Sequence, residues 1–461
     1  MRLNYFNLRK ISNQYLITNE YGFYCYINED ELNDLVNERY DRLPHSTLQE
    51  LEDKYFIFNC DKDVFIEKVK HLYRESKRYL FSATSLHIFV MTNACNLACR
   101  YCQAQDSDQN CKGFMTKETA KKAVDIALQS PTRQLSFEFQ GGEPLLNYET
   151  IKYIVQYSKE VCNDKIIEYS IVSNTLLLTD EMIQFFKEYN VRVSTSLDGG
   201  TIVHDYNRPM INGSPTYKSV VSNIRILADN NIGAGAIQTT TRKSLTHAEE
   251  IIEAYKTCGL KHIFVRPLTP LGYAREHWDE IGYTADEYLA FYNHMLDLII
   301  EENLNGNHMV EGHAMIFLNK ILRQNFENYM ELRSPCGAGT GQIAYYYDGD
   351  VYTCDEARMV SEMGDDSFRL GNVDNSYDEL MDSNICKVTC QASVLESLPS
   401  CCDCIYHAYC GVCPVVNLAL NGSIYERVAN SYRCKIYKGM LDAVFERLTV
   451  DSVKQIFEKW V

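Results

Sequence analysis

The segment Met91–Gln103, MTNACNLACRYCQ, directly follows a short apolar run and carries three cysteines, Cys95, Cys99 and Cys102. Their C-x3-C-x2-C spacing can supply three thiolates to a cubane iron–sulfur cluster, which normally takes four. A structural zinc site also needs four ligands, and no fourth cysteine stands at a matching interval. We therefore expect a cluster with one open iron, to which a small molecule can bind.

The composition is that of an ordinary soluble protein. The chain has 461 residues, of which 46% are apolar and 23% charged, and this length suggests two or three domains. A formal net charge of −17 argues against a nucleic-acid or acidic-membrane partner. The first residues lack a signal-peptide pattern, and no apolar run is long enough for a membrane span. We expect a cytoplasmic protein, in which eighteen cysteines indicate metal binding rather than disulfides.

Strands and amphipathic helices alternate in the middle of the chain. The expected strands are Leu86–Met91, Leu135–Gln140, Ile166–Asn174, Val191–Asp198, Gly233–Thr241 and His262–Leu268. The expected helices are Lys117–Gln129, Tyr148–Val161, Asp180–Tyr189, Ser219–Asn230, Thr246–Cys258 and Thr284–Asn303. Six βα units are too few for a closed eight-stranded barrel, so we expect an α/β fold with a partial (β/α)6 barrel. Its chemistry should gather at the carboxyl ends of the strands.

The rest of the chain divides around this barrel. Two short strands joined by a polar turn, then two short helices, predict a winged-helix-like α+β module in residues 1–60. This module either packs on the barrel as an extension or binds a leader peptide, and both interpretations stay open. Residues 61–85 are expected to be a helical connector, 86–305 the barrel, 306–440 a cysteine-rich domain and 441–461 a terminal helix.

Polar and glycine residues follow successive expected strands. Paired glycines let a backbone approach a ligand closely, and the carboxylate beside them can accept hydrogen bonds from an ammonium group. Amide, hydroxyl and carboxylate groups can bind a ribose or a carboxylate, and an arginine can pair with a carboxylate through two hydrogen bonds. The residues concerned are Gly141, Gly142, Glu143, Asn174, Ser196, Asp198 and Arg208. Each signal is weak alone, but their shared place at the strand ends predicts one site.

A second group of cysteines lies in the C-terminal third. A β-hairpin with its turn at Gly349 is expected between the first two of these cysteines. The later cysteines have C-x2-C-x5-C-x2-C spacing, and one more stands further on. The cysteines are Cys336, Cys354, Cys401, Cys404, Cys410, Cys413 and Cys434. Such spacings indicate metal, with zinc as the competitor to iron–sulfur clusters.

The cysteine loop, with Tyr101 before its last cysteine, resembles that of the radical S-adenosylmethionine (SAM) enzymes, as do the GGEP and SLDG segments. The resemblance implies that Cys95, Cys99 and Cys102 hold a catalytic [4Fe–4S] cluster whose open iron chelates SAM. A reduced cluster would cleave SAM to a 5′-deoxyadenosyl radical, which removes hydrogen from the substrate. The implied SAM-binding residues are Tyr101, Gly141, Gly142, Glu143, Asn174, Ser196, Asp198, Arg208 and Leu268. The usual Asn-Gly pair is Asn174-Thr175 here, so that turn must form without glycine.

The C-terminal cysteines resemble the SPASM extension of radical SAM peptide maturases, which implies two auxiliary [4Fe–4S] clusters and three clusters in all. The outer cluster would take Cys401, Cys404, Cys410 and Cys434, and the inner cluster Cys336, Cys354 and Cys413. Some members have a fourth inner ligand where Gln342 stands here, so the inner cluster has an open iron or borrows Cys386 or Cys390. Asp355 matches a base of sulfatase maturases, although a simple hydrogen-bonding role is the alternative.

A finer resemblance lies in RSPCGAGTGQIAYYYDGDVYTCDEARM, FRLGNV and CIYHAYCGVCPV, which look like the His-Xaa-Ser system maturases of the HxsB type. It implies an enzyme that crosslinks a ribosomal precursor peptide, is reduced by a flavodoxin or ferredoxin, and works beside a second radical SAM protein. One alternative is an anaerobic sulfatase maturase that forms formylglycine. An alternative of another class is a non-catalytic zinc-binding peptide chaperone.

Overall fold

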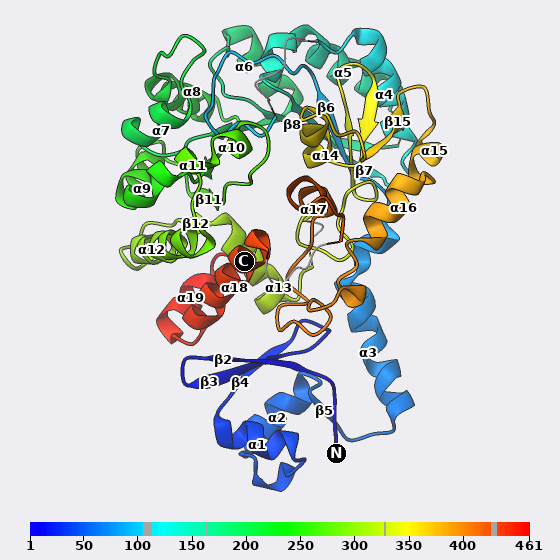
Figure 1. The fold of residues 1–461 in the computed structure, drawn as a ribbon, viewed down its shortest axis with the longest axis vertical. Helices are drawn as coiled ribbons and strands as arrows, with labels where there is room; N and C mark the ends of the chain where they lie inside the picture. Colours follow the sequence, from blue (N-terminus) through cyan, green and yellow to red (C-terminus); the bar gives the residue numbers. More distant parts are fainter. Residues whose placement is uncertain (105–112, 163, 327–328, 426–430) are drawn as a thin grey trace.

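One large sheet forms the centre of the molecule (Figure 1). The computed structural model describes residues 1–104, 113–162, 164–326, 329–425 and 431–461. Within these ranges the sheet has ten strands in the order β12-β11-β10-β9-β8-β7-β6-β13-β14-β15. The strands are β6 (Leu86–Val90), β7 (Gln134–Gln140), β8 (Ile166–Val172), β9 (Val191–Ser196), β10 (Ala234–Thr239), β11 (His262–Arg266), β12 (Val310–Glu311), β13 (Gln342–Tyr345), β14 (Asp350–Tyr352) and β15 (Arg369–Asn372).

Strands β6 to β12 are parallel neighbours in chain order, which confirms the predicted partial barrel. The barrel also has a strand that the sequence did not predict, because β12 is only two residues long and shows no periodicity. At the other edge β13 pairs with β6 in parallel, and β14 and β15 continue the sheet antiparallel. The C-terminal region therefore extends the barrel sheet directly.

Helices cover the outer face of the barrel strands (Figure 1). The main ones are α4 (Lys117–Gln129), α5 (Tyr148–Val161), α6 (Asp180–Tyr189), α8 (Tyr217–Asp229), α9 (Ala248–Thr257) and α12 (Ala285–Leu304), with the short helices α7 (Thr201–Asn207), α10 (Tyr273–Glu276) and α11 (Trp278–Ile281) between them. Side-chain caps begin several of them, since Thr116 and Thr179 each accept a hydrogen bond from the backbone N–H three residues later. Their apolar faces pack on fully buried strand residues such as Phe137 and Phe139. Each such side chain contributes roughly 1.5–3 kcal/mol of transfer free energy.

The N-terminal residues form a module with its own small core. An antiparallel sheet of β2 (Asn7–Ile11), β3 (Gln14–Thr18) and β4 (Tyr24–Ile27) is followed by α1 (Glu29–Val36) and α2 (His45–Asp53), and β1 (Arg2–Leu3) pairs with β5 (Ile57–Phe58). The β3–β4 hairpin and both helices agree with the sequence prediction. β2 was missed because its central residues, Leu8, Arg9 and Lys10, are all exposed and show no alternation of apolar and polar side chains. The module lies at one end of the molecule in Figure 1, against the C-terminal region.

Helix α3 (Lys62–Ser76) leads from this module to the barrel. After the barrel come α13 (Gly312–Arg323), α14 (Asp355–Ser361), α15 (Tyr377–Met381), α16 (Asn384–Gln391), α17 (Pro414–Asn421), α18 (Tyr432–Leu448) and α19 (Asp451–Glu458). Helix α18 begins before Cys434, so the boundary that we placed at residue 440 falls inside a helix. None of the helices in the described ranges has both the length and the apolar character to cross a bilayer.

Candidate active site

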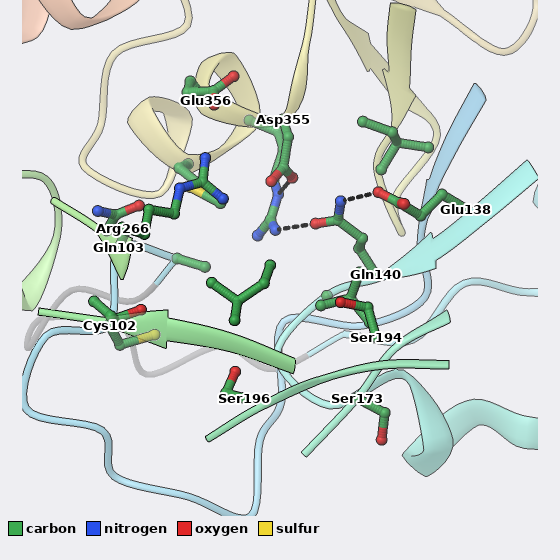
Figure 2. Close-up of a pocket in the computed structure, with 18 of the residues that line it drawn as sticks. Cys102, Gln103, Glu138, Gln140, Ser173, Ser194, Ser196, Arg266, Asp355 and Glu356 are labelled. Carbon is green, nitrogen blue, oxygen red and sulfur yellow. Dashed lines mark hydrogen bonds and ion pairs between the residues drawn. The ribbon is translucent and has the colours of Figure 1, made fainter. Parts of the chain in front are cut away.

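A cavity of about 670 Å³ opens where the barrel strands end, between the cysteine loop and α14 (Figure 2). Figure 2 shows Asp355 and Glu356 on one side of it, opposite Cys102, Ser173 and Ser196. The predicted site residues that line it are Cys95, Cys99, Tyr101, Cys102, Gly141, Gly142, Asn174, Ser196, Arg208 and Asp355. Residues far apart in sequence thus line one cavity, whereas Glu143, Asp198 and Leu268 are not among the lining residues.

The cysteine loop supplies three thiols to the cavity, and no other cysteine of the described residues lines it. Backbone bonds fix the loop, because Ala98 N donates to Pro209 O at 2.9 Å and Arg100 N to Asn207 O at 3.0 Å. Burial raises the pKa of Cys95 to about 11, so iron must displace a proton when it binds. Three thiols and no fourth fit a [4Fe–4S] cluster with one open iron.

A hydrogen-bonded chain links the loop to the fourth barrel strand. Arg208 Nη1 donates to the Tyr101 hydroxyl at 2.7 Å, and that hydroxyl donates to Asp198 Oδ2 at 2.8 Å. Asn207 Nδ2 donates to the same oxygen at 3.0 Å. Burial raises the pKa of Asp198, and the Arg208 charge and these hydrogen bonds oppose that shift. Asp198 therefore orients Tyr101 from behind, while Arg208 reaches the cavity wall.

The two glycines after β7 touch the backbone of the cysteine loop. A Cβ at Gly141 would lie 2.2 Å from Thr92 O, and a Cβ at Gly142 would lie 2.2 Å from Ala94 O. Both positions therefore require glycine. Glu143 is fully buried and accepts hydrogen bonds from backbone and side-chain groups of the β7 and β8 ends, including Asn174 N at 2.8 Å. Its carboxylate thus ties two strand ends together.

The turn after β8 forms without glycine, as the Asn174-Thr175 pair requires. Thr175 takes the left-handed conformation, with φ of 64°, although it is β-branched. Three hydrogen bonds hold it: its N–H donates to Ser173 Oγ at 2.9 Å, its hydroxyl donates to Asn174 O at 2.7 Å, and its carbonyl accepts from Asn223 Nδ2 at 2.8 Å. The Asn174 side chain donates to Asn96 Oδ1 at 2.7 Å, which connects this turn to the cysteine loop.

Several lining residues were missed by sequence reasoning. Leu268 is buried and does not line the cavity, whereas its neighbour Pro267 does, so the role of Leu268 at SAM stays a prediction. Glu138 and Gln140 on β7 line the cavity, and Gln140 Nε2 donates to Glu138 Oε1 at 2.6 Å. Polar residues alternate with phenylalanines along β7, and this pattern could have predicted a polar inner face. The charged residues and one amide among the others are Gln103, Arg266, Glu331, Glu356 and Arg358.

The C-terminal cysteines gather in two places. Those implied for the outer cluster, with Cys413, line one small cavity next to the start of α18: Cys401, Cys404, Cys410 and Cys434. Cys336, Cys354 and Cys413 are buried in one apolar cluster. A hydrogen bond between the side chains of Cys386 and Cys390, which both lie on α16, lowers the pKa of Cys390 to about 7. In the described ranges, no three acidic, histidine or cysteine side chains converge on a single metal ion.

Comparison with known proteins gives the class. Residues 89–253 match the family model of the Radical SAM superfamily. The chain is 25% identical over 463 residues to the radical SAM cyclopropyl synthase TigE of Paramaledivibacter caminithermalis, covering 94% of this chain and 86% of TigE. It is 26% identical over 376 residues to a cysteine-type anaerobic sulfatase-maturating enzyme of Clostridium perfringens, covering 79% of this chain and 97% of that protein.

Solved structures share the fold. The structure of native anSMEcpe with bound AdoMet superposes with a TM-score of 0.69 at 24% identity, over 81% of this chain and 100% of that chain. Streptococcus suis SuiB bound to its precursor peptide SuiA superposes with a TM-score of 0.53 at 15% identity, over 93% of this chain and 99% of SuiB. These matches identify a radical SAM enzyme, with the family match confined to barrel residues 89–253, and the chain is similar to sulfatase maturases and TigE. These matches favour an enzyme over the non-catalytic zinc-binding chaperone.

Proposed function

We propose that this enzyme removes a hydrogen atom from a ribosomally made precursor peptide and installs a modification in it, namely an intramolecular crosslink. One observation carries the proposal. The cysteine loop and Arg208 on the barrel side line the same cavity as Asp355 on the C-terminal side. A substrate in that cavity would meet both the radical source and the cysteine-rich region. The solved structures of SuiB bound to its precursor peptide SuiA and of anSMEcpe bound to a peptide support a peptide substrate.

The cavity residues fit the cofactors of the class. Cys95, Cys99 and Cys102 would hold the catalytic cluster, and SAM would lie along Gly141-Gly142 with Arg208 at its carboxylate. Together the bound cluster and SAM supply a 5′-deoxyadenosyl radical. The chain's own residues then orient the peptide and keep water out. Asp355, whose Oδ1 accepts from Arg358 Nε at 2.7 Å, would take the proton that the modified residue releases. The electron released with that proton would go to a cluster held by the C-terminal cysteines.

The C-terminal cysteines would hold two further [4Fe–4S] clusters, for three in all. Cys401, Cys404, Cys410 and Cys434 share one cavity, and this supports the outer ligand set. The shared burial of Cys336, Cys354 and Cys413 supports the inner set, with Cys386, Cys390 or an open iron as its fourth position. A flavodoxin or ferredoxin would deliver the electron, and a second radical SAM protein of an HxsB-type pair would act on the same peptide.

Residues 1–60 would recognise the leader segment of that peptide. β2 is an edge strand of the module's sheet, and the Leu8 side chain on it is 49% exposed. An exposed edge can add an extended peptide as a further strand. The module also contacts the outer cysteine loop, since Thr18 Oγ1 donates to Ile405 O at 2.6 Å and Asn7 Nδ2 to Cys404 O at 3.2 Å. Leader binding would thus take place beside the outer cluster.

The experiment is anaerobic co-expression with the short peptide encoded beside the gene, followed by mass spectrometry. We expect a loss of two hydrogens within the peptide and formation of 5′-deoxyadenosine from SAM. The second candidate function is sulfatase maturation, favoured by the fold match to anSMEcpe. Formylglycine on a co-expressed sulfatase, with an unchanged peptide, would establish that alternative and contradict the crosslinking proposal.

A further inference from the structure

Arg358 is a fully buried arginine in the wall of the active-site cavity. It lies on α14, one turn after Asp355, and it is 2% exposed, so it ranks among the largest fully buried side chains of the described residues. It also lines the cavity. A guanidinium keeps its charge in proteins and carries five N–H donors in a rigid fork. The partners of those donors therefore decide what Arg358 does.

Two nitrogens of the Arg358 guanidinium have hydrogen-bond acceptors, and the third nitrogen has none within the described ranges. Arg358 Nε donates to Asp355 Oδ1 at 2.7 Å, and Nη2 donates to Gln140 Oε1 at 3.4 Å. Among the residues that the structure describes, Nη1 has no hydrogen-bond partner, although it is buried. A buried charged donor without an acceptor costs about 1–3 kcal/mol or more. The hydrogen bonds of Nε and Nη2 fix the fork in the cavity wall, and Nη1 is the donor that still lacks an acceptor in the described part of the chain.

The charges around the guanidinium indicate the kind of acceptor. Asp355 already balances the charge of Arg358, and Glu331 balances Arg266 at 2.9 Å. The nearby Glu138 side chain meets the neutral side chains of Gln140 and Ser170, and burial raises its pKa. The Arg358 guanidinium therefore already has its counter-charge in Asp355. A second carboxylate entering here would bring a buried charge without a partner, whereas a neutral carbonyl would not.

We propose that Arg358 binds the substrate by donating a hydrogen bond from Nη1 to a neutral carbonyl oxygen of the peptide. This inference rests on the proposed function, because it takes the cavity to hold a peptide. The substrate class is then a peptide recognised through a main-chain or side-chain amide at the reacting segment, not through a carboxylate. Gln140, which accepts a hydrogen bond from Arg358, directly precedes the Gly141-Gly142 turn. A peptide bound to Arg358 would therefore lie next to the proposed SAM site.

The test uses peptide backbone alone as the probe. Triglycine with an acetylated N-terminus and an amidated C-terminus is titrated into cluster-loaded, SAM-bound enzyme, and its Kd is measured by saturation-transfer NMR. We expect wild-type enzyme to bind it, and Arg358→Gln and Arg358→Lys to bind it about tenfold or more weakly, the usual effect of losing a hydrogen bond to a charged group. Triglycine with a free carboxylate should bind wild-type enzyme more weakly than the capped form.

Controls separate binding from folding. Arg447→Gln removes another arginine, one that pairs with Asp297 on the far helices, and should leave the Kd for capped triglycine unchanged. Equal affinity of wild-type and both Arg358 variants, no binding to wild-type enzyme, or tighter binding of the free carboxylate would each overturn the proposal. A tenfold loss of SAM affinity in the Arg358 variants, with unchanged affinity for capped triglycine, would also overturn the proposal. Wild-type protein that makes no 5′-deoxyadenosine yet keeps the triglycine difference would contradict the proposed function alone.

Discussion

Arg208 and Tyr101 are joined by a 2.7 Å hydrogen bond from the guanidinium to the phenol oxygen, and the phenol in turn donates to buried Asp198. The aromatic residue of the cysteine loop thus connects the loop to the end of β9. Arg208 is also the arginine that we expect at the SAM carboxylate. The position of this guanidinium therefore depends on a hydroxyl that belongs to the cluster-binding loop.

Tyr101→Phe should lower SAM affinity about tenfold, because Arg208 loses a hydrogen-bond acceptor and hydrogen bonds to charged groups contribute about 1.5–3 kcal/mol. Equilibrium dialysis of SAM against the anaerobic enzyme measures the effect. Iron content should stay unchanged, since the three cysteines remain. Tyr157→Phe, at a tyrosine bonded to Asp125 away from the cavity, is the matched control. Unchanged SAM affinity in Tyr101→Phe would show that Arg208 needs no support from the loop.

Cys99→Ala should remove one cluster, about four iron atoms per chain, and abolish 5′-deoxyadenosine formation. The thiol lines the cavity, and neither neighbouring cysteine can replace it in the loop. Iron and sulfide analysis of the reconstituted protein checks the result. Cys60→Ala, at a partly exposed cysteine outside the described cavities, should keep full iron content and activity. Retained activity in Cys99→Ala would refute the assignment of the catalytic cluster.

Gly142→Ala should destabilise the protein by about 1–3 kcal/mol and lower SAM affinity, because the new methyl group would overlap Ala94 O at 2.2 Å. The start of the cysteine loop would have to move. Gly233→Ala is the control, since its Cβ would meet Arg192 Cγ at an ordinary 3.9 Å. Chemical unfolding and SAM dialysis compare the two variants. Equal stability of both would mean that the loop tolerates displacement.

The sequence predicted the barrel well because local periodicity sets its elements. Helix α5 has the bounds that its apolar spacing indicated, and β7 differs by one residue. The cysteine loop and the predicted site residues at the other strand ends also line one cavity, because the carboxyl ends of parallel strands meet at one edge of the sheet. These features depend on short stretches of chain, which single-sequence patterns describe directly.

The C-terminal side of the site depends on pairing between distant segments, which no local pattern shows. Ile343 of β13 pairs with His87 of β6, more than two hundred residues away, and this pairing brings α14 over the barrel mouth. The contact between Arg358 and Gln140 follows from it. The hydrogen bonds that Asp198 accepts from Tyr101 and Asn207 likewise join residues that no local pattern connects, and its role at SAM stays a prediction.

Thr175→Gly should be more stable than Thr175→Ala by about 1 kcal/mol, the reverse of the usual order for these two residues. Both variants lose the hydroxyl bond to Asn174 O, but only glycine relieves the left-handed backbone of the turn, with its φ of 64°. Denaturant unfolding of the two variants gives the difference. A more stable alanine variant would show that this turn relaxes out of the left-handed region.

Glu138→Gln should become increasingly more stable than wild type as the pH rises. Burial raises the pKa of Glu138, and hydrogen bonds from Gln140 and Ser170 oppose the shift only in part. The folded carboxyl therefore keeps its proton to a higher pH than the unfolded one, whose pKa is about 4.3. Its stabilising contribution is complete below that value and is lost as the pH rises through the folded pKa.

Glutamine keeps the hydrogen bond to Gln140 but has no proton to lose. Melting temperatures from pH 5.5 to 8.5 should thus show a gap between Glu138→Gln and wild type that widens with pH. Glu188→Gln, at an exposed glutamate on α6, should show a constant gap. If the Glu138→Gln gap is also constant, the Glu138 carboxyl is ionised across this range and the cavity is wetter at β7 than its burial indicates.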